Sequence, residues 1–362
     1  MNKRIIFPFV GDSFGGSHKS SILLIKHLKS LGFDTHVVLH SSGKLIEEQL
    51  KIHDIEYSHL KLNALAGDSP NVIRIFFNLI RNMKKISMYI IKNQPDIVHG
   101  NDLRINLSWG LITRLTGKKF VWHQRTVLSG SLKWKALPIL ANYFIAISNF
   151  VLSSFPKNIK PNKQSVIYNP IELRPKKDSS NITNDFFKIL YLGRVVPEKS
   201  VEIILELASE LSKRNYQFKI NIVGNGEPLY IRSLESMSQE LNISKYVEFK
   251  GFSHFPEEQI YEADCLISPC ENEGLGRAVL EAMSCETVVI AADSGAHKEI
   301  IQHKKNGFLF LPNCLDDLIR HVDYVMSNDT QDIIRNAKRF CDNNFSINNH
   351  IRNIKDVYNS LI

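Results

Sequence analysis

Residues 271–284 read ENEGLGRAVLEAMS, and the interpretation of the whole chain starts from this stretch. Glu273 and Glu281 stand eight positions apart. A Gly-x-Gly turn at 274–276 follows the first carboxylate, and an apolar helical run carries the second. If a helix opens near Gly276, its first backbone N–H groups favour negative charge. The apolar neighbours predict a largely buried helix, so the Glu281 carboxylate needs a partner.

A second motif, GRVVPEK at 193–199, lies upstream at the end of a candidate strand. Arg194 offers a planar fork to phosphate oxygens, and Lys199 offers a point charge. Cations at a helix start oppose the helix dipole, which favours a functional reason for them over ordinary solvated side chains. The two motifs together supply cations for a diphosphate and carboxylates for hydroxyl groups, as a nucleotide sugar requires.

Outward from these motifs, short β-rich runs alternate with longer helical runs. The strands are predicted at 4–10, 35–40, 96–99, 120–123, 144–147, 165–168, 189–192, 219–223, 247–250, 265–268, 287–291 and 308–310. The helices are predicted at 17–31, 71–92, 104–116, 149–155, 200–214, 228–241, 257–262 and 276–284. The alternation predicts parallel sheets covered by helices on both faces. Its restart near residue 189 predicts two Rossmann-like domains, joined by the Pro- and Ser-rich segment 169–181.

Composition agrees with a folded two-domain protein of 362 residues, because 43% of residues are hydrophobic and 23% are charged. No apolar run approaches the roughly 18 residues that span a bilayer, and the first strand is too short for a secretory signal. The five cysteines form no C-x-x-C pair. We therefore expect a cytoplasmic protein without a zinc site.

The positive charge is concentrated in the first half, where residues 1–172 contain 23 Lys and Arg against 10 Asp and Glu. The segment 71–92 predicts a basic amphipathic helix. Lys133-Trp134-Lys135 is a second segment with basic and aromatic side chains. One interpretation is peripheral contact with an anionic membrane through 71–92 and 133–135. The other is a lysine-rich solvent face. We expect no nucleic-acid partner.

Further candidates stand at strand ends of both halves. Gly15 and Gly16 precede the first helix, where backbone can approach a ligand, although the spacing is not G-x-G-x-x-G. Gly224 follows a strand of the second half and suits either a ligand-lining turn or an ordinary one. His123 and His99 end neighbouring strands. Each histidine fits either a structural role or a hydrogen bond to a sugar hydroxyl or an oxyanion.

With these motifs the chain resembles the retaining nucleotide-sugar glycosyltransferases of the GT-B fold, the group called glycosyltransferase family 4. The E-x7-E pattern of Glu273 and Glu281 is the strongest match. Matching segments run nearly end to end, among them FGGSHKS, DIVHGND, KFVWHQR and ILYLGRVVPEKSVEIILELA. The resemblance implies two Rossmann-like domains with parallel sheets that face a central cleft. It implies an acceptor-binding domain at 1–170, a nucleotide-sugar-binding domain at 171–345, and a C-terminal helix at about 346–362 that packs back onto the first.

The resemblance also implies roles for individual residues. Arg194 and Lys199 would bind the donor diphosphate and stabilise the leaving nucleotide, while Glu273 contacts the sugar ring beside His123. Glu281 would hold the ribose. We thus expect catalytic roles for His123, Glu273, Arg194 and Lys199, and donor binding by Gly15, Gly16, Arg194, Lys199, Gly224, Phe252, Glu273, Gly274, Leu275, Gly276 and Glu281.

Four positions depart from the pattern of the family. The usual Asn-Gly before the linker is Asn169-Pro170, and a usual histidine is Asn101. The usual small-x-Pro is Cys285-Glu286-Thr287, and the usual Gly-Gly near the donor is Gly295-Ala296. These departures leave the expected fold intact and leave the identity of the donor open.

The sequence therefore predicts transfer of a sugar from a nucleoside diphosphate to a hydroxyl, with anomeric retention and without metal or cofactor. The acceptor would be a glycan or lipid-linked glycan of a bacterial lipopolysaccharide, O-antigen or capsule pathway, met at the inner face of the cytoplasmic membrane. Two alternatives stay open. One is a GT-B nucleotide-sugar 2-epimerase, for which His99, His123 and Glu273 supply few acid–base groups. The other is a sugar-nucleotide-binding protein without catalysis.

Overall fold

The computed structural model of the chain describes residues 3–12, 15–63, 72–128, 132–171 and 186–362; the side chains of 72–76, 79 and 132–134 lie outside the description. The chain divides into two compact units. Unit 1 comprises Met1–Pro170 and Ile347–Ile362, and unit 2 comprises Ile171–Ser346. Most of the expected linker, residues 172–181, lies outside the described residues.

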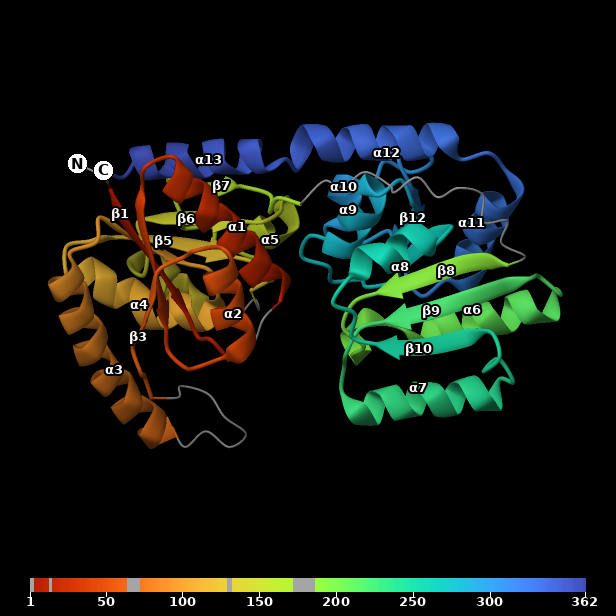
Figure 1. Ribbon diagram of the computed structural model, residues 1–362, viewed down its shortest axis with the longest axis horizontal. Helices are drawn as coiled ribbons and strands as arrows, with labels where there is room; N and C mark the ends of the chain where they lie inside the picture. The colour runs from red at the N-terminus through yellow and green to blue at the C-terminus, as the bar shows by residue number, and fades with distance from the viewer. Residues whose placement is uncertain (1–2, 13–14, 64–71, 129–131, 172–185) are drawn as a thin grey trace. The chain divides into compact units, whose positions relative to one another are not determined.

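Unit 1 is built on a parallel seven-stranded sheet in the order β3-β2-β1-β4-β5-β6-β7 (Figure 1). Its strands are β1 (Arg4–Phe9), β2 (Asp34–Leu39), β3 (Tyr57–His59), β4 (Ile97–Gly100), β5 (Lys119–Gln124), β6 (Tyr143–Ala146) and β7 (Gln164–Val166). Its helices are α1 (Gly16–Ser30), α2 (Lys44–Ile52), α3 (Val72–Asn93), α4 (Leu103–Leu115), α5 (Asn149–Ser153) and α13 (Ile347–Asn359), with 3-10 segments η1 (Leu132–Ile139) and η2 (Pro161–Lys163). The strand order reverses direction between β1 and β4.

Unit 2 repeats the plan with a parallel six-stranded sheet in the order β10-β9-β8-β11-β12-β13. Its strands are β8 (Phe187–Leu192), β9 (Phe218–Val223), β10 (Val247–Gly251), β11 (Cys265–Ser268), β12 (Val288–Ala292) and β13 (Phe308–Phe310). Its helices are α6 (Glu202–Lys213), α7 (Pro228–Glu240), α8 (Pro256–Glu262), α9 (Arg277–Ser284), α10 (His297–Ile300), α11 (Leu315–Ser327) and α12 (Gln331–Asn344), with the 3-10 turn η3 (Pro197–Lys199). Here the order reverses between β8 and β11.

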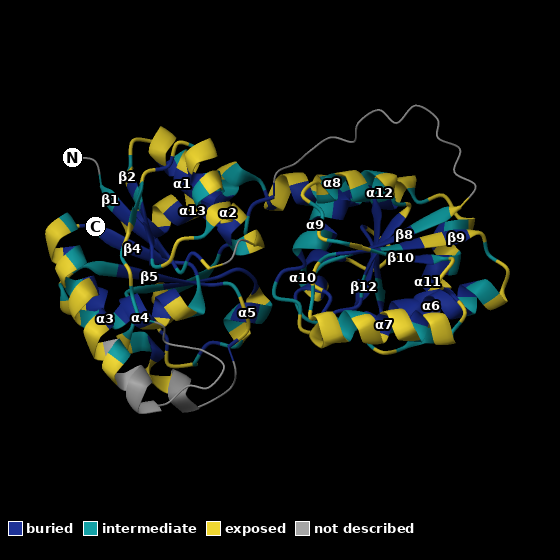
Figure 2. Cartoon of the chain, turned by 60° about the horizontal axis from the view of Figure 1, so that its bottom comes forward, coloured by how far each residue is buried: buried dark blue, intermediate teal, exposed yellow. Residues whose placement is uncertain are grey.

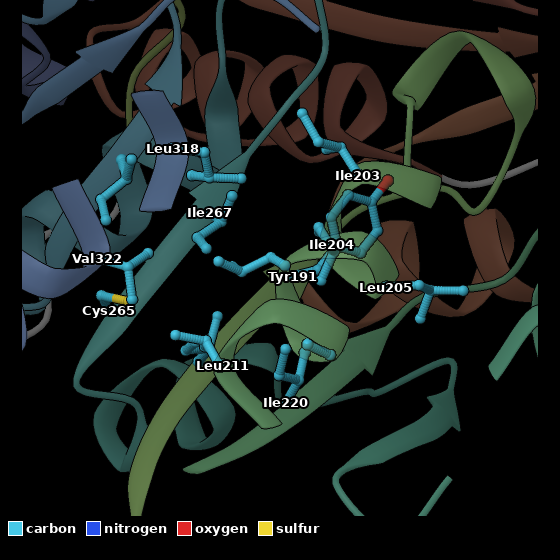
Figure 3. Packing of buried hydrophobic residues seen from close by; sticks show 14 of the residues in the cluster. Tyr191, Ile203, Ile204, Leu205, Leu211, Ile220, Cys265, Ile267, Leu318 and Val322 are labelled. Atoms are coloured by element: carbon cyan, nitrogen blue, oxygen red, sulfur yellow. The ribbon is translucent and has the colours of Figure 1, made fainter. Parts of the chain in front are cut away.

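Central strands such as β1, β4 and β12 are apolar and buried on both faces because helices cover both sides of each sheet. Figure 2 shows buried residues along the strands and exposed residues on the outer sides of the helices. In unit 2, side chains of α6 and α11 meet those of β8, β9 and β11 in one core (Figure 3). Tyr191, Ile204 and Leu318 are each at most 3% exposed within it. This packing holds the strand ends, and therefore the loops that follow them, in place.

The last helix, α13, completes the core of unit 1 although it follows unit 2 in the sequence. It packs beside α1 (Figure 1). Ile354 and Tyr358 are fully buried in the same cluster as Ile5 and Phe7 of β1. The apolar positions of α13 recur at helical spacing, and burying them supplies the stability that a helix of this length lacks alone.

Candidate active site

The loops of unit 2 that carry the expected donor-binding residues follow adjacent strands. Lys199 lies in η3 after β8, Gly224 follows β9, and Glu273 lies in the loop after β11. Strand β8 stands between β9 and β11 in the sheet. Since all strands are parallel, these loops share one edge, and the reversal of strand order between β8 and β11 is where open α/β sheets bind ligands.

An ion pair joins the two loops at that reversal point. Lys199 Nζ lies 2.5 Å from Glu273 Oε2, and the two side chains are 19% and 21% exposed. Nζ also donates to Cys270 Sγ at 3.5 Å. Burial disfavours charge on Glu273, but Lys199 outweighs this effect and holds the pKa of the carboxyl below its usual value. Burial likewise opposes the charge on Lys199, and Glu273 nevertheless raises the pKa of the ammonium.

The Gly-x-Gly turn holds Glu273 against the start of α9. Gly276 is the N-cap of α9 with φ +79°, a left-handed conformation that favours glycine. A Cβ on Gly276 would also approach Cδ2 of His297 to 3.1 Å. On the other side, the Ala296 N–H donates to the Glu273 carbonyl at 2.9 Å. The family departure Gly295-Ala296 therefore lies directly against the turn that carries Glu273.

His297 was not among the residues predicted from the sequence. It is fully buried, its Nδ1 lies 3.1 Å from the Ala292 carbonyl, and its Nε2 lies 3.2 Å from Ser268 Oγ. Because a carbonyl only accepts, Nδ1 carries the proton and Nε2 accepts from the serine. Burial lowers the pKa of His297. The sequence contained a signal for His297, because it follows the end of β12 and candidate residues had already been found after the ends of β8, β9 and β11.

Arg194 lies in the loop after β8, which is packed on the glycine turn after β9. Gly193 N–H donates to the Val223 carbonyl at 3.0 Å, and Val195 N–H donates to the Asn225 carbonyl at 2.9 Å. The Arg194 side chain is exposed and makes no ion pair within the described residues. Its guanidinium is thus available for an anionic ligand.

Two further predicted residues of unit 2, Glu281 and Phe252, contact other groups. Glu281 is half-buried and pairs with Arg277 one helical turn earlier, at 2.6 Å. Arg277 is thus the partner that the Glu281 carboxylate was expected to need. The ion pair uses one carboxylate oxygen and leaves the other for a ligand. Phe252 follows β10, is 58% exposed and meets the His254 ring edge-on at 5.0 Å.

The other predicted residues lie in unit 1. Gly15 is the exposed N-cap of α1, followed by exposed Gly16, and the Gly15 N–H donates to His18 Nδ1 at 3.2 Å. His123 of β5 is fully buried. Its Nδ1 lies 3.1 Å from His99 Nε2, so the histidines of two adjacent strands are in contact.

Two arginines of unit 1, Arg104 and Arg125, were not among the residues predicted from the sequence. Arg104 pairs with Asp12 through both terminal guanidinium nitrogens, at 2.6 and 3.1 Å. The pair links the first turn of α4, which follows β4, to the loop after β1, where the strand order of unit 1 reverses. Arg125 donates to Asn101 at 2.9 Å and to Ser21 at 3.1 Å. Asn101 thus has a structural partner where the family has a histidine.

Comparison with known proteins assigns the chain to a family. The family described as Glycosyltransferase Family 4 matches residues 14–174, and the family described as Glycosyl transferases group 1 matches residues 174–340. With its two parallel-sheet α/β units, the chain belongs to the GT-B glycosyltransferases of family 4 type.

Relatives match over most of the chain at low identity. An uncharacterized glycosyltransferase of Methanocaldococcus jannaschii is 25% identical over 99% of this chain and 97% of its own. The lipopolysaccharide 1,6-galactosyltransferase of Salmonella typhimurium is 25% identical over 75% of this chain and 77% of its own. The crystal structure of Anabaena HepE in complex with UDP and glucose superimposes with a TM-score of 0.84 at 19% identity, covering 99% of this chain and 100% of that one.

Proposed function

We propose that the protein is a retaining glycosyltransferase that moves a sugar from a nucleoside diphosphate to a hydroxyl of a glycan or lipid-linked glycan. The observation that carries this proposal is the Lys199–Glu273 pair, which unites the loops of β8 and β11 where the strand order of unit 2 reverses. Lys199 supplies charge for a pyrophosphate, and Glu273 offers an acceptor for sugar hydroxyls. The family membership and the UDP and glucose of the HepE crystal support a nucleotide-sugar donor.

The chemistry follows from the charges at this edge of the sheet. Arg194, Lys199 and the first N–H groups of α9 would neutralise the departing diphosphate, a task that a divalent metal performs elsewhere. The leaving phosphate oxygen would take the proton of the acceptor hydroxyl, which then attacks on the face that the nucleotide leaves. Anomeric configuration is thereby retained, and proton NMR of the product checks it: an inverted centre would exclude this course.

Donor binding is tested by thermal unfolding with UDP, GDP and ADP and their sugars. A ligand that binds the folded state alone raises the apparent stability, by about 2.7 kcal/mol at one hundred times its Kd. We expect one nucleotide series to raise Tm in the wild type and not in Arg194→Ala, because the exposed Arg194 guanidinium contributes to diphosphate binding rather than to the fold.

The matched control is Arg214→Ala, which removes a guanidinium of unit 2 that pairs with Asp323 at 3.0 Å on the surface, away from the loops described above. It should keep the ligand-induced rise in Tm. If no nucleotide raises the Tm of the wild type, or if Arg194→Ala keeps the full rise, the proposed binding of the diphosphate is wrong.

We further propose that the acceptor is met at the inner face of the cytoplasmic membrane, in a bacterial surface-polysaccharide pathway. The Salmonella relative acts on lipopolysaccharide by name. None of the helices among the described residues has the length and apolarity to cross a bilayer, so contact would be peripheral. Helix α3 supplies a surface for it, shown with its exposed residues in Figure 2.

One side of α3 combines apolar and basic residues. Phe77, Ile80, Lys84, Met88 and Ile91 recur at intervals of three or four, and the four apolar side chains are 47–61% exposed. Exposed Arg81, Lys85 and Lys92 flank this stripe. The opposite side is anchored by buried Ile86 and Ile90. An apolar stripe flanked by cations fits the headgroup region of an anionic bilayer. The side chains of Lys133 and Trp134 lie outside the described residues.

Co-sedimentation with phosphatidylcholine vesicles, with and without phosphatidylglycerol, tests this surface. Each cation near an anionic leaflet contributes about 1 kcal/mol. The double variant Arg81→Gln, Lys84→Gln should therefore bind phosphatidylglycerol vesicles at least about tenfold more weakly. Met88→Ser with Ile91→Ser should weaken binding similarly, whereas Leu229→Ser, at a 76% exposed leucine of unit 2, should not. Equal sedimentation of all variants would exclude α3 as the contact.

A further inference from the structure

Three buried rings of unit 1 form a hydrogen-bonded chain that ends at His123. The chain begins at Tyr358 of α13, whose hydroxyl lies 2.5 Å from His99 Nδ1. His99 Nε2 lies 3.1 Å from His123 Nδ1. All three side chains are fully buried. The last atom of the chain, His123 Nε2, is buried without a hydrogen-bond partner among the described residues.

The position of each proton follows from the Tyr358 end. Within the described part of the chain, His99 is the one hydrogen-bond partner of the Tyr358 hydroxyl. A buried O–H without an acceptor is strongly disfavoured, so Tyr358 donates to His99 Nδ1. A neutral imidazole carries one proton, which His99 must then hold on Nε2 and donate to His123 Nδ1. His123 therefore holds its own proton on Nε2.

The surroundings support neutral rings. Burial, with Arg125 adding to it, lowers the pKa of His99 and of His123 well below the usual value, and His350 lowers both further. Burial raises the pKa of Tyr358, which keeps it a hydroxyl. The opposite direction of the chain would leave both the Tyr358 O–H and the lone pair on His123 Nε2 buried without partners. The direction given above leaves only one unpaired donor, the His123 Nε2–H.

We propose that Tyr358 and His99 are positioning residues that hold His123 in the Nε2–H tautomer, so that His123 donates a hydrogen bond to an oxygen of the bound sugar and does not act as a base. This inference rests on the proposed function and on the family resemblance, which implies that His123 contacts the donor sugar. His123 is near the carboxyl end of β5, the edge where α/β sheets bind ligands. Since none of the described residues accepts a hydrogen bond from this donor, it is left to bind a ligand oxygen.

The inference gives α13 a task beyond packing. Tyr358 is the residue of α13 that forms a hydrogen bond with His99. Tyr358 lies 235 positions after His123 in the sequence. Docking of the C-terminal helix on unit 1 would therefore set the proton position at a residue of the expected active site. The substitution Tyr358→Phe removes the hydroxyl and keeps the ring, so it separates this task from the contribution of the ring to the core.

The tautomer is measured directly by 15N NMR of the full chain labelled at its histidines, because protonated and unprotonated ring nitrogens differ widely in chemical shift. The His99 and His123 signals are assigned by their loss in His99→Gln and His123→Gln. We expect His123 to be protonated at Nε2 in the wild type and in Tyr57→Phe, a tyrosine packed against the same core. In Tyr358→Phe we expect a substantial Nδ1–H population. A wild-type His123 protonated at Nδ1, or an unchanged tautomer in Tyr358→Phe, would overturn the inference.

Calorimetric titration with UDP-glucose and with UDP tests the contact with the sugar. Tyr358→Phe should bind UDP-glucose about tenfold more weakly than the wild type and bind UDP equally well, because UDP lacks the sugar. Equal weakening of both ligands would indicate a general structural defect and would overturn the proposed contact. If the wild type binds neither ligand, UDP-glucose is not the donor, and the NMR result still decides whether Tyr358 sets the tautomer.

Discussion

Replacing Lys199 with alanine is expected to lower the rate constant of glycosyl transfer by about 10²–10³-fold, the usual cost of removing one preorganised charge from a developing anion. Lys199 is the cation that the structure places between the loops of β8 and β11, 2.5 Å from Glu273. Its loss removes charge from the departing diphosphate and releases Glu273 from its position. Transfer to the native acceptor, or donor hydrolysis without acceptor, measures the effect.

The same variant should also lose stability, by about 2–3 kcal/mol near neutral pH, because Glu273 is left partly buried without its partner. The pKa of Glu273 is lowered in the folded protein. The pair therefore stabilises the fold above the ordinary pKa of a glutamate, and this contribution is lost as the pH falls through the lowered value. The difference in Tm between wild type and Lys199→Ala should accordingly shrink in acid.

Lys298→Ala is the matched control for both measurements. Lys298 approaches Asp293 at 3.7 Å, its side chain is 61% exposed, and it belongs to the same unit. Exposed pairs of this kind contribute about 0–1 kcal/mol, so activity and Tm should stay near the wild-type values. A Lys199→Ala enzyme that transfers sugar within threefold of the wild-type rate would rule out the assigned role of Lys199.

Replacing Gly226 with alanine is expected to cost about 3 kcal/mol of folding free energy, since an added carbon that overlaps packed backbone atoms forces them apart. A Cβ at Gly226 would lie 1.7 Å from the Val195 carbonyl oxygen. The turn after β9 and the loop after β8 would have to separate, which moves Arg194 with them. Chemical denaturation measures the stability, and titration with the nucleotide measures the loss of binding.

Gly251→Ala separates steric overlap from backbone strain. Gly251 has φ +66° and no atom within 4 Å of an added Cβ, so alanine there introduces strain without overlap. A left-handed conformation costs a non-glycine residue roughly 1–2 kcal/mol. If Gly226→Ala were no more destabilising than Gly251→Ala, the close contact between the two loops would not be a structural requirement.

The fold was largely predictable because most of its helices and strands have a recognisable pattern of apolar residues in the local sequence. Buried parallel strands are short apolar runs, and β11 and β13 begin and end at the predicted residues. The sequence pattern did not indicate α2 or β3. Strand β3 is three residues long and lies at the sheet edge, where only one neighbour and little burial constrain the sequence.

The sequence pattern singled out residues of the candidate site, and it did not indicate which of them are in contact. Lys199 and Glu273 were both expected, but their contact depends on β8 and β11 being neighbours, which strand order decides and local sequence does not. The partner of Glu281, Arg277, stands four residues earlier and follows from helical spacing. The contact of His99 with Tyr358 links residues 259 positions apart and required the fold.

The central claim is that Arg194 and Lys199 bind the pyrophosphate of a sugar nucleotide while Glu273 binds its sugar. A crystal structure with an intact donor tests this claim most directly. We predict phosphate oxygens within hydrogen-bond distance of both cations and a sugar hydroxyl on the Glu273 carboxylate. A donor bound elsewhere, with these three side chains turned away from it, would contradict the account.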